Sequence, residues 1–148
     1  MLRRFEQFTS AISRIYKSVQ KIKSLEMTAY GLRANHVMLL YHLKMHPDGL
    51  TPSQLCELCG VDKAAVSRAV TELAEKGYLR IEEIKGQRYR LPATLTPSGI
   101  EAAEHIEEAV MRAVRIGGRG LTEQERADFY HALLLIADNL KQYFEDGA

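Results

Sequence analysis

Two helix-start signals lie close together near the middle of the chain, and they constrain its fold more than any other feature. Thr51 is followed by Pro52 and, three positions on, by Gln54, which is the pattern of a capping box with proline in the first helical turn. Gly60 suits a left-handed helix terminus, and Asp62 suits the cap of a second helix. Two short helices joined by a glycine-containing turn predict a helix-turn-helix.

The second of these helices, predicted over residues 62–76, has two different faces. Steps of three or four residues separate its apolar side chains, so these share one inner face. The outer face carries small, hydroxyl and basic side chains: Lys63, Ala64, Ser67, Arg68 and Thr71. The major groove of B-DNA is about 12 Å wide and admits a helix, and arginine bonds guanine there in a bidentate manner. We therefore take the outer face as a candidate DNA-binding surface, the alternative being an ordinary solvated face.

A β-hairpin is predicted directly after this helix. Residues 78–84 partly alternate between apolar and polar, residues 85–87 suit a turn, and residues 88–91 can return as an antiparallel strand that Pro92 limits. A hairpin in this position is a wing. Its cations, Lys85, Arg88 and Arg90, are candidates for contacts with phosphates or with the minor groove.

Long helices with apolar stripes are predicted on both sides of this region, over residues 2–25 and 97–116 and after the T-x-x-E capping box at 122–125. The stripe of the helix over 97–116 is predicted to place Ile100, Ala103, Ile106, Val110 and Val114 inward. A 148-residue chain has little core to cover all these stripes, which favours a two-fold dimer. The alternative is that the helices fold back on their own chain.

Composition places the chain among globular domains. Hydrophobic residues make up 46% and charged residues 26% of 148 residues, and no apolar run approaches the roughly 20 residues that cross a bilayer. The N-terminal segment lacks the apolar core of a secretory signal, so we expect a cytoplasmic protein without membrane contact. The net charge of +1 conceals +6 over residues 1–46 and −5 over residues 93–148. This asymmetry fits either an anionic partner or plain solvation.

Other kinds of site have little support in the sequence. Cys56 and Cys59 form a C-x-x-C pair, but they fall near the end of the predicted helix, where the helix dipole disfavours a thiolate. We expect packed core cysteines, with redox sensing as the alternative. No second C-x-x-C exists for a zinc site, and no nucleotide-binding or hydrolase motif is present. We therefore expect no metal, no cofactor and no enzymatic activity.

Four segments of the sequence resemble the MarR family of transcription regulators. They are TPSQL at 51–55, GVDKAAVSR at 60–68, LAEKGYL at 73–79 and LTPSG at 95–99. The resemblance implies a mainly α fold with a small β-hairpin wing. It also implies a single domain over residues 1–148, in which dimerisation helices at 1–30 and 97–148 flank a winged helix-turn-helix at 31–96. At the wing, most members carry an aspartate closely followed by arginine, whereas this chain has Gln87 before Arg88.

The same resemblance implies a function. It predicts a homodimeric, sequence-specific regulator of transcription, most often a ligand-responsive repressor, that binds a pseudo-palindromic operator in double-stranded DNA. Its half-sites would lie about one helical turn, roughly 34–36 Å, apart. A small aromatic or lipophilic effector is expected near the junction of the dimerisation and DNA-binding parts, where element order places Tyr30, His36 and Tyr41. The alternatives are a protein-interaction module without DNA binding and a thiol-based redox regulator.

Overall fold

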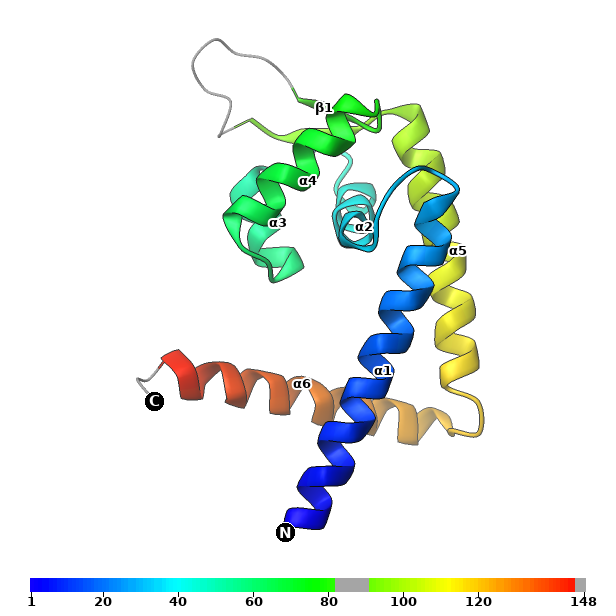
Figure 1. Ribbon diagram of the computed structural model, residues 1–148, viewed down its shortest axis with the longest axis vertical. Helices are drawn as coiled ribbons and strands as arrows, with labels where there is room; N and C mark the ends of the chain where they lie inside the picture. Colours follow the sequence, from blue (N-terminus) through cyan, green and yellow to red (C-terminus); the bar gives the residue numbers. More distant parts are fainter. Residues whose placement is uncertain (82–90, 146–148) are drawn as a thin grey trace. The chain divides into compact units, whose positions relative to one another are not determined.

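The computed structural model describes residues 1–81 and 91–145, and most of this part of the chain is helical. Helix α4 packs against α3, and β1 lies at the other end of α4, as in a winged helix-turn-helix (Figure 1). The elements, in chain order, are α1 (Leu2–Thr28), the 3₁₀ helix η1 (Ala34–His36), α2 (Val37–Met45), α3 (Pro52–Cys59), α4 (Lys63–Glu75), β1 (Leu79–Ile81), β2 (Ala93–Leu95), α5 (Pro97–Gly117) and α6 (Glu123–Glu145).

The chain divides into two compact units, Met1–Met111 and Arg112–Ala148. The first unit contains every element from α1 to β2 and most of α5, and it holds the hydrophobic core. The second unit contains α6, none of whose residues is buried. The apolar stripe predicted for this helix is present but uncovered, since its large side chains are exposed: Phe129, Ile136, Leu140 and Phe144.

The predicted helix-turn-helix is confirmed, including the contacts that start each helix. Thr51 Oγ1 accepts a hydrogen bond from the Gln54 N–H at 3.3 Å, and Gln54 Oε1 accepts one from the Thr51 N–H at 2.9 Å. Asp62 Oδ1 accepts from the Ala65 N–H at 2.8 Å. Gly60 ends α3 with φ at 63°, in the left-handed region that glycine enters without strain. Local side-chain chemistry therefore fixes both ends of the turn.

The segment between α1 and α2 contains a short 3₁₀ turn rather than a continuation of either α-helix. Residues 34–36 form η1, and the α-helix begins only at Val37. The reason lies in His36. Its ring Nδ1 accepts a hydrogen bond from the Arg33 backbone N–H at 3.0 Å, and its backbone N–H donates to the Arg33 carbonyl at 3.0 Å. These two bonds satisfy the backbone of Arg33 within a three-residue turn and separate Arg33 from α2.

In the described part of the hairpin, β1 pairs with β2, which begins after Pro92, with Leu79 opposite Leu95 and Ile81 opposite Ala93. The return strand predicted over residues 88–91 falls almost wholly outside the described residues. Proline has no N–H to donate, whereas the Ala93 N–H donates to the Leu50 carbonyl at 2.9 Å. The Leu50 N–H donates back to the Ala93 carbonyl at 3.1 Å. The segment 82–90 lies outside the described residues.

The inward face predicted for α5 was wrong for three of its five side chains. Ile100, Val110 and Val114 are exposed, whereas Ala103 and Ile106 are buried as expected. The residues on the buried face are mostly small: Gly99, Ala102, Ala103, Ile106 and Ala109. At its first turn α5 lies close to the segment that follows α4, since a Cβ on Gly99 would lie only 2.1 Å from the Tyr78 carbonyl oxygen. This close approach requires glycine at residue 99.

The start of α5 is joined to the end of α4 through Thr96. Its Oγ1 donates to the Gly77 carbonyl at 2.6 Å and accepts from the Gly99 N–H at 3.1 Å. The Thr96 N–H donates to the Tyr78 carbonyl at 3.0 Å. These contacts give a physical role to the LTPSG segment. Its Thr96 and Gly99 allow the first turn of α5 to pack closely against the residues that follow α4.

Candidate nucleic-acid interface

The predicted outer face of α4 is open to solvent. Lys63, Ala64, Arg68 and Thr71 are exposed, and Ser67 is half-buried. The opposite face is fully packed, with four side chains in the core: Val66, Ala69, Val70 and Leu73. The helix therefore presents a continuous polar surface of small and basic side chains, which is the form of a helix that reads a major groove.

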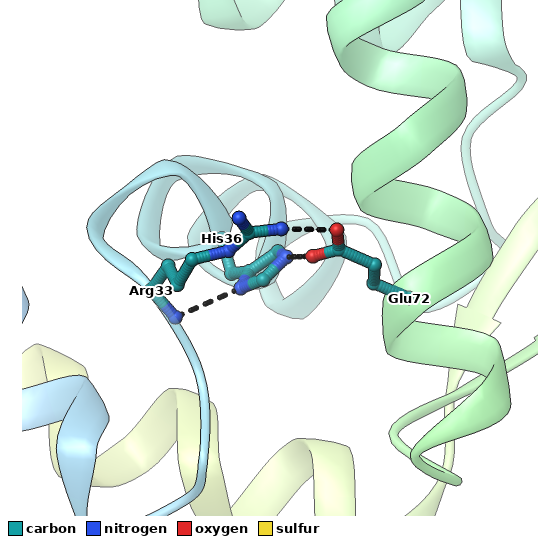
Figure 2. Close-up of polar contacts among 3 residues, drawn as sticks. All are labelled: Arg33, His36 and Glu72. Atoms are coloured by element: carbon teal, nitrogen blue, oxygen red, sulfur yellow. Dashed lines mark hydrogen bonds and ion pairs between the residues drawn. The ribbon is translucent and has the colours of Figure 1, made fainter.

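Glu72 is turned away from this surface toward η1. Its Oε1 forms an ion pair with the Arg33 guanidinium, and its Oε2 lies 2.8 Å from His36 Nε2 (Figure 2). Glu72 is 30% exposed, whereas the His36 side chain is only 1% exposed. The Arg33 guanidinium therefore offsets the negative charge of Glu72 on α4.

Two opposed effects set the protonation of this cluster. Burial lowers the pKa of His36 below its ordinary value, although the hydrogen bond that His36 donates to Glu72 and the charge of Glu72 raise it. The Arg33 guanidinium lowers the pKa of Glu72, with a smaller contribution from His36. Because His36 Nδ1 accepts the Arg33 N–H, the proton of the neutral imidazole belongs on Nε2, where it is donated to Glu72.

A cavity of about 820 Å³ lies beside α4 within the first unit. It takes residues from α1, η1, α2, the end of α3 and α4: Tyr16, Gln20, Lys23, Ser24, Thr28, Leu32, Arg33, Ala34, Asn35, Met38, Leu39, Cys59, Val61, Ala65 and Ala69. Arg33 thus belongs both to the cavity wall and to the Glu72 cluster. Sequence reasoning missed this double role, because nothing in the chain pattern pairs residue 33 with residue 72.

The cavity contains a second cation, Lys23. Burial lowers the pKa of this ammonium, with a smaller opposing effect from Cys59. Over the described ranges, 1–81 and 91–145, no carboxylate lies within ion-pair distance of Lys23. A half-buried ammonium without an acidic partner favours an anion beside it.

The three residues predicted to line an effector pocket are not among those that line this cavity. Tyr30 packs against His105, with ring centroids 5.3 Å apart, and its carbonyl accepts from the Tyr78 hydroxyl at 2.9 Å. His36 is buried in the Glu72 cluster, and Tyr41 is exposed with its ring 5.2 Å from that of His42. A ligand-binding role for Tyr30, His36 and Tyr41 stays a prediction.

Both cysteines occupy the last turn of α3, as the sequence predicted. Cys56 and Cys59 are free, half-buried thiols that pack against the hydrophobic core. Burial raises the pKa of the Cys59 thiol, and the neighbouring Cys56 acts in the same direction. A redox role for the pair stays a prediction. Within the described part of the chain, no group of three or more histidine, cysteine or acidic residues is placed to hold a metal ion.

The wing cations cannot be placed on this surface, because Lys85, Arg88 and Arg90 lie outside the described residues, as does Gln87. At the described base of the hairpin, Arg80 on β1 is exposed. None of the helices in the described ranges has the length and apolar character needed to span a lipid bilayer.

Known proteins resemble this chain in sequence across the same region. A sequence model described as the MarR family matches residues 30–88, which run from the end of α1 beyond β1. A protein of Thauera aromatica assigned as a transcriptional regulatory protein for the hcr operon is 33% identical over 78 residues. This match covers 53% of the present chain and 47% of that protein. Over this region the chain resembles the MarR family of transcription regulators, and it spans about half the length of the curated relative that it matches.

Solved structures of MarR proteins show the same fold over almost the whole chain. A MarR family regulator from Listeria monocytogenes in complex with 26mer DNA has a TM-score of 0.82 at 19% identity and covers 94% of each chain. The MarR protein of Staphylococcus aureus in complex with salicylate and kanamycin has a TM-score of 0.80 at 15% identity, covering 95% of this chain and 94% of that one. Members of the MarR family are transcription regulators rather than enzymes.

Proposed function

We propose that this protein is a MarR-type, sequence-specific regulator of transcription that inserts α4 into the major groove of its operator. The observation that carries the proposal is the division of α4 into a packed apolar face and an exposed face bearing Lys63, Ser67, Arg68 and Thr71. Arg68 would read guanine and Thr71 the methyl group of thymine. The DNA complex of the Listeria monocytogenes relative supports this mode of binding.

The working form would be a homodimer. Large apolar side chains are exposed along α1, where Phe5, Phe8 and Ile12 are 66%, 39% and 37% exposed, and all along α6. Apolar surface on this scale is unfavourable in water, and a second copy of the chain offers the same kind of surface in return. Two copies would carry two α4 helices, which fits a pseudo-palindromic operator.

An effector would bind in the cavity beside α4. The cavity has an apolar wall that includes Met38 and Leu39, and it has cations at Lys23 and Arg33. The Staphylococcus aureus relative contains salicylate, a small aromatic anion. A ligand that binds one arrangement of α4 better than another would shift the protein toward that arrangement, which is how a ligand-responsive repressor leaves its operator.

Selection of bound duplexes from a random DNA pool tests the proposal. The full-length protein should enrich a two-fold symmetric site, and Arg68→Ala should lose the preference at one position in each half-site. Arg115→Ala, which removes an exposed arginine from α5, is the matched control and should retain the site. Affinity for the selected site should fall steeply with salt, since bound phosphates release counterions.

Recovery of no sequence above background at low salt would contradict the proposal, and it would favour a winged helix used for protein interaction. An enriched site that Arg68→Ala and Arg115→Ala both retain would leave DNA binding intact. It would show, however, that Arg68 does not read it.

A further inference from the structure

Arg33 belongs to two sites in this structure. Its guanidinium pairs with Glu72 of α4, and Arg33 is also among the residues that line the cavity. The Arg33 side chain is 67% exposed, so it is free to change partner without breaking core packing. Ala65 and Ala69 of α4 line the same cavity, which places the recognition helix at the wall.

The chemistry of the cavity selects the kind of molecule that would compete for Arg33. Lys23 and Arg33 are the cations of its wall, and Met38, Leu39 and Val61 supply apolar surface. Lys23 is half-buried and has no carboxylate partner among the residues that the structure describes. A small organic anion with an apolar body would satisfy both features at once.

We propose that Arg33 is a positioning residue that relays occupancy of the cavity to α4: an organic anion in the cavity draws the Arg33 guanidinium away from Glu72. Glu72 then keeps His36 as its hydrogen-bond partner but loses the cation that held α4 to the start of η1. Only the last step, an altered fit of α4 to DNA, rests on the proposed function. The competition between the anion and Glu72 does not require DNA.

The relay leaves the local fold around Arg33 in place. The contact that forms η1 comes from the Arg33 backbone N–H, which His36 Nδ1 accepts, and not from the guanidinium. A side chain can therefore be removed at residue 33 without removing this turn. The same holds for Glu72→Gln, since the amide oxygen can still accept from His36 Nε2 while the negative charge is lost.

The first experiment measures probe binding by calorimetry, without DNA. The probes are benzoate, salicylate and a medium-chain fatty carboxylate, each paired with its neutral amide. Glu72→Gln should bind the carboxylates about two- to five-fold more tightly than wild type, the scale of one exposed ion pair, and should bind the amides equally. Glu75→Gln removes an exposed carboxylate from the same helix and is the matched control for overall charge. It should bind every probe as wild type does.

Three results would overturn the relay. The first is that no carboxylate binds saturably to wild type. The second is that carboxylates and amides bind equally well. The third is that Glu72→Gln and Glu75→Gln change carboxylate affinity by the same factor, because the effect would then be long-range charge and not release of Arg33.

The second experiment measures DNA affinity with and without the bound carboxylate, and compares the ratio of the two affinities in each variant. Using the ratio cancels any change in the basal affinity of a variant. In wild type the carboxylate should weaken DNA binding, and in Arg33→Gln and Glu72→Gln the ratio should approach one. Lys23→Met should bind the carboxylate more weakly but, once saturated, should retain the wild-type ratio. A wild-type ratio in Glu72→Gln would refute the relay.

The two experiments separate the two proposals. If wild type selects no DNA, the proposed regulator function fails, while the calorimetric comparison still decides whether an anion competes with Glu72 for Arg33. If DNA is bound but the calorimetric comparison gives one of the three contrary results, the regulator function stands and the relay fails.

Discussion

His36 Nε2 and Glu72 Oε2 lie 2.8 Å apart, which joins the turn before α2 to the last turn of α4 across 36 positions of sequence. The imidazole is almost completely buried, and its other nitrogen is occupied by the Arg33 N–H. Both nitrogens of the neutral ring are therefore satisfied. Protonation would place a second N–H against the Arg33 N–H, so the contact favours the neutral form.

The pKa of His36 should lie below its ordinary value of about 6.5, because burial disfavours the charged ring. A pKa lowered by folding means that the unfolded chain binds the proton more readily. The contribution of neutral His36 to the free energy of unfolding is therefore fully present above about pH 6.5, and it is lost as the pH falls through the pKa of His36 in the folded protein. Titration of the His36 ring protons by NMR measures the value, and urea unfolding between pH 7 and pH 5 measures the stability.

Glu72→Gln tests the cause of this shift. The carboxylate raises the pKa of His36 against the effect of burial, so its removal should lower the pKa of His36 further. A rise in this variant, or a wild-type pKa above the ordinary value, would show that burial is not the dominant effect.

Gly99→Ala should destabilise the protein, by about 1–3 kcal/mol, because its Cβ would lie 2.1 Å from the Tyr78 carbonyl oxygen and force α5 outward. Gly117→Ala is the control on the same helix, where a Cβ meets nothing within 4 Å. This second change should be neutral or stabilising by up to about 1 kcal/mol, since alanine favours a helix. Chemical denaturation measures both, and equal effects would contradict the close packing of Gly99.

Cys59 should be a slow nucleophile at neutral pH. Burial raises the pKa of its thiol, with Cys56 adding to the rise and Lys23 opposing it, and only the thiolate reacts. In Cys56→Ser, where Cys59 is the single thiol, alkylation should be slower in the folded protein than in urea and should accelerate as the pH rises. Lys23→Met should slow it further.

The thiol-sensing alternative makes the opposite prediction. It requires peroxide to change the DNA affinity of wild type and to have no such effect when Cys56→Ala and Cys59→Leu are combined. We expect peroxide to leave DNA affinity unchanged in both. Fast alkylation of folded Cys59 at neutral pH would also support sensing.

A charge placed on the apolar stripe of α1 should dissociate the proposed dimer. Ile12→Glu should lower the mass measured by sedimentation toward that of a single 16.7 kDa chain, because a carboxylate would have to be buried between the two copies. Ser10→Glu adds the same charge at an exposed position off the stripe and should leave the mass unchanged. Wild type that sediments as a monomer at every concentration would contradict the dimer.

The parts of the fold that could be predicted from sequence are those whose structure depends on residues close together in the chain. The boundaries of α3 and α4 follow from Thr51, Gly60 and Asp62, whose contacts reach no further than four residues. The split of α4 into two faces follows in the same way from helical spacing.

The features that escaped prediction depend on distant partners. The buried face of α5 includes Gly99, whose place against the Tyr78 carbonyl depends on a residue of another element. The pairing of Ala93 with Leu50 also joins residues far apart in sequence. The Arg33–Glu72 pair and the cavity likewise join elements whose proximity no spacing rule reveals.

Ala93 lies opposite Ile81 in the hairpin, and both of its backbone hydrogen bonds are formed with Leu50, just before the helix-turn-helix. A hairpin held by one strand alone would bend like a hinge under load, whereas this one is anchored at its root to the residue next to Thr51. If bound DNA displaced the hairpin, the Leu50–Ala93 hydrogen bonds would therefore also displace the first turn of α3. In the proposed DNA complex, the hairpin and the helix-turn-helix would move together.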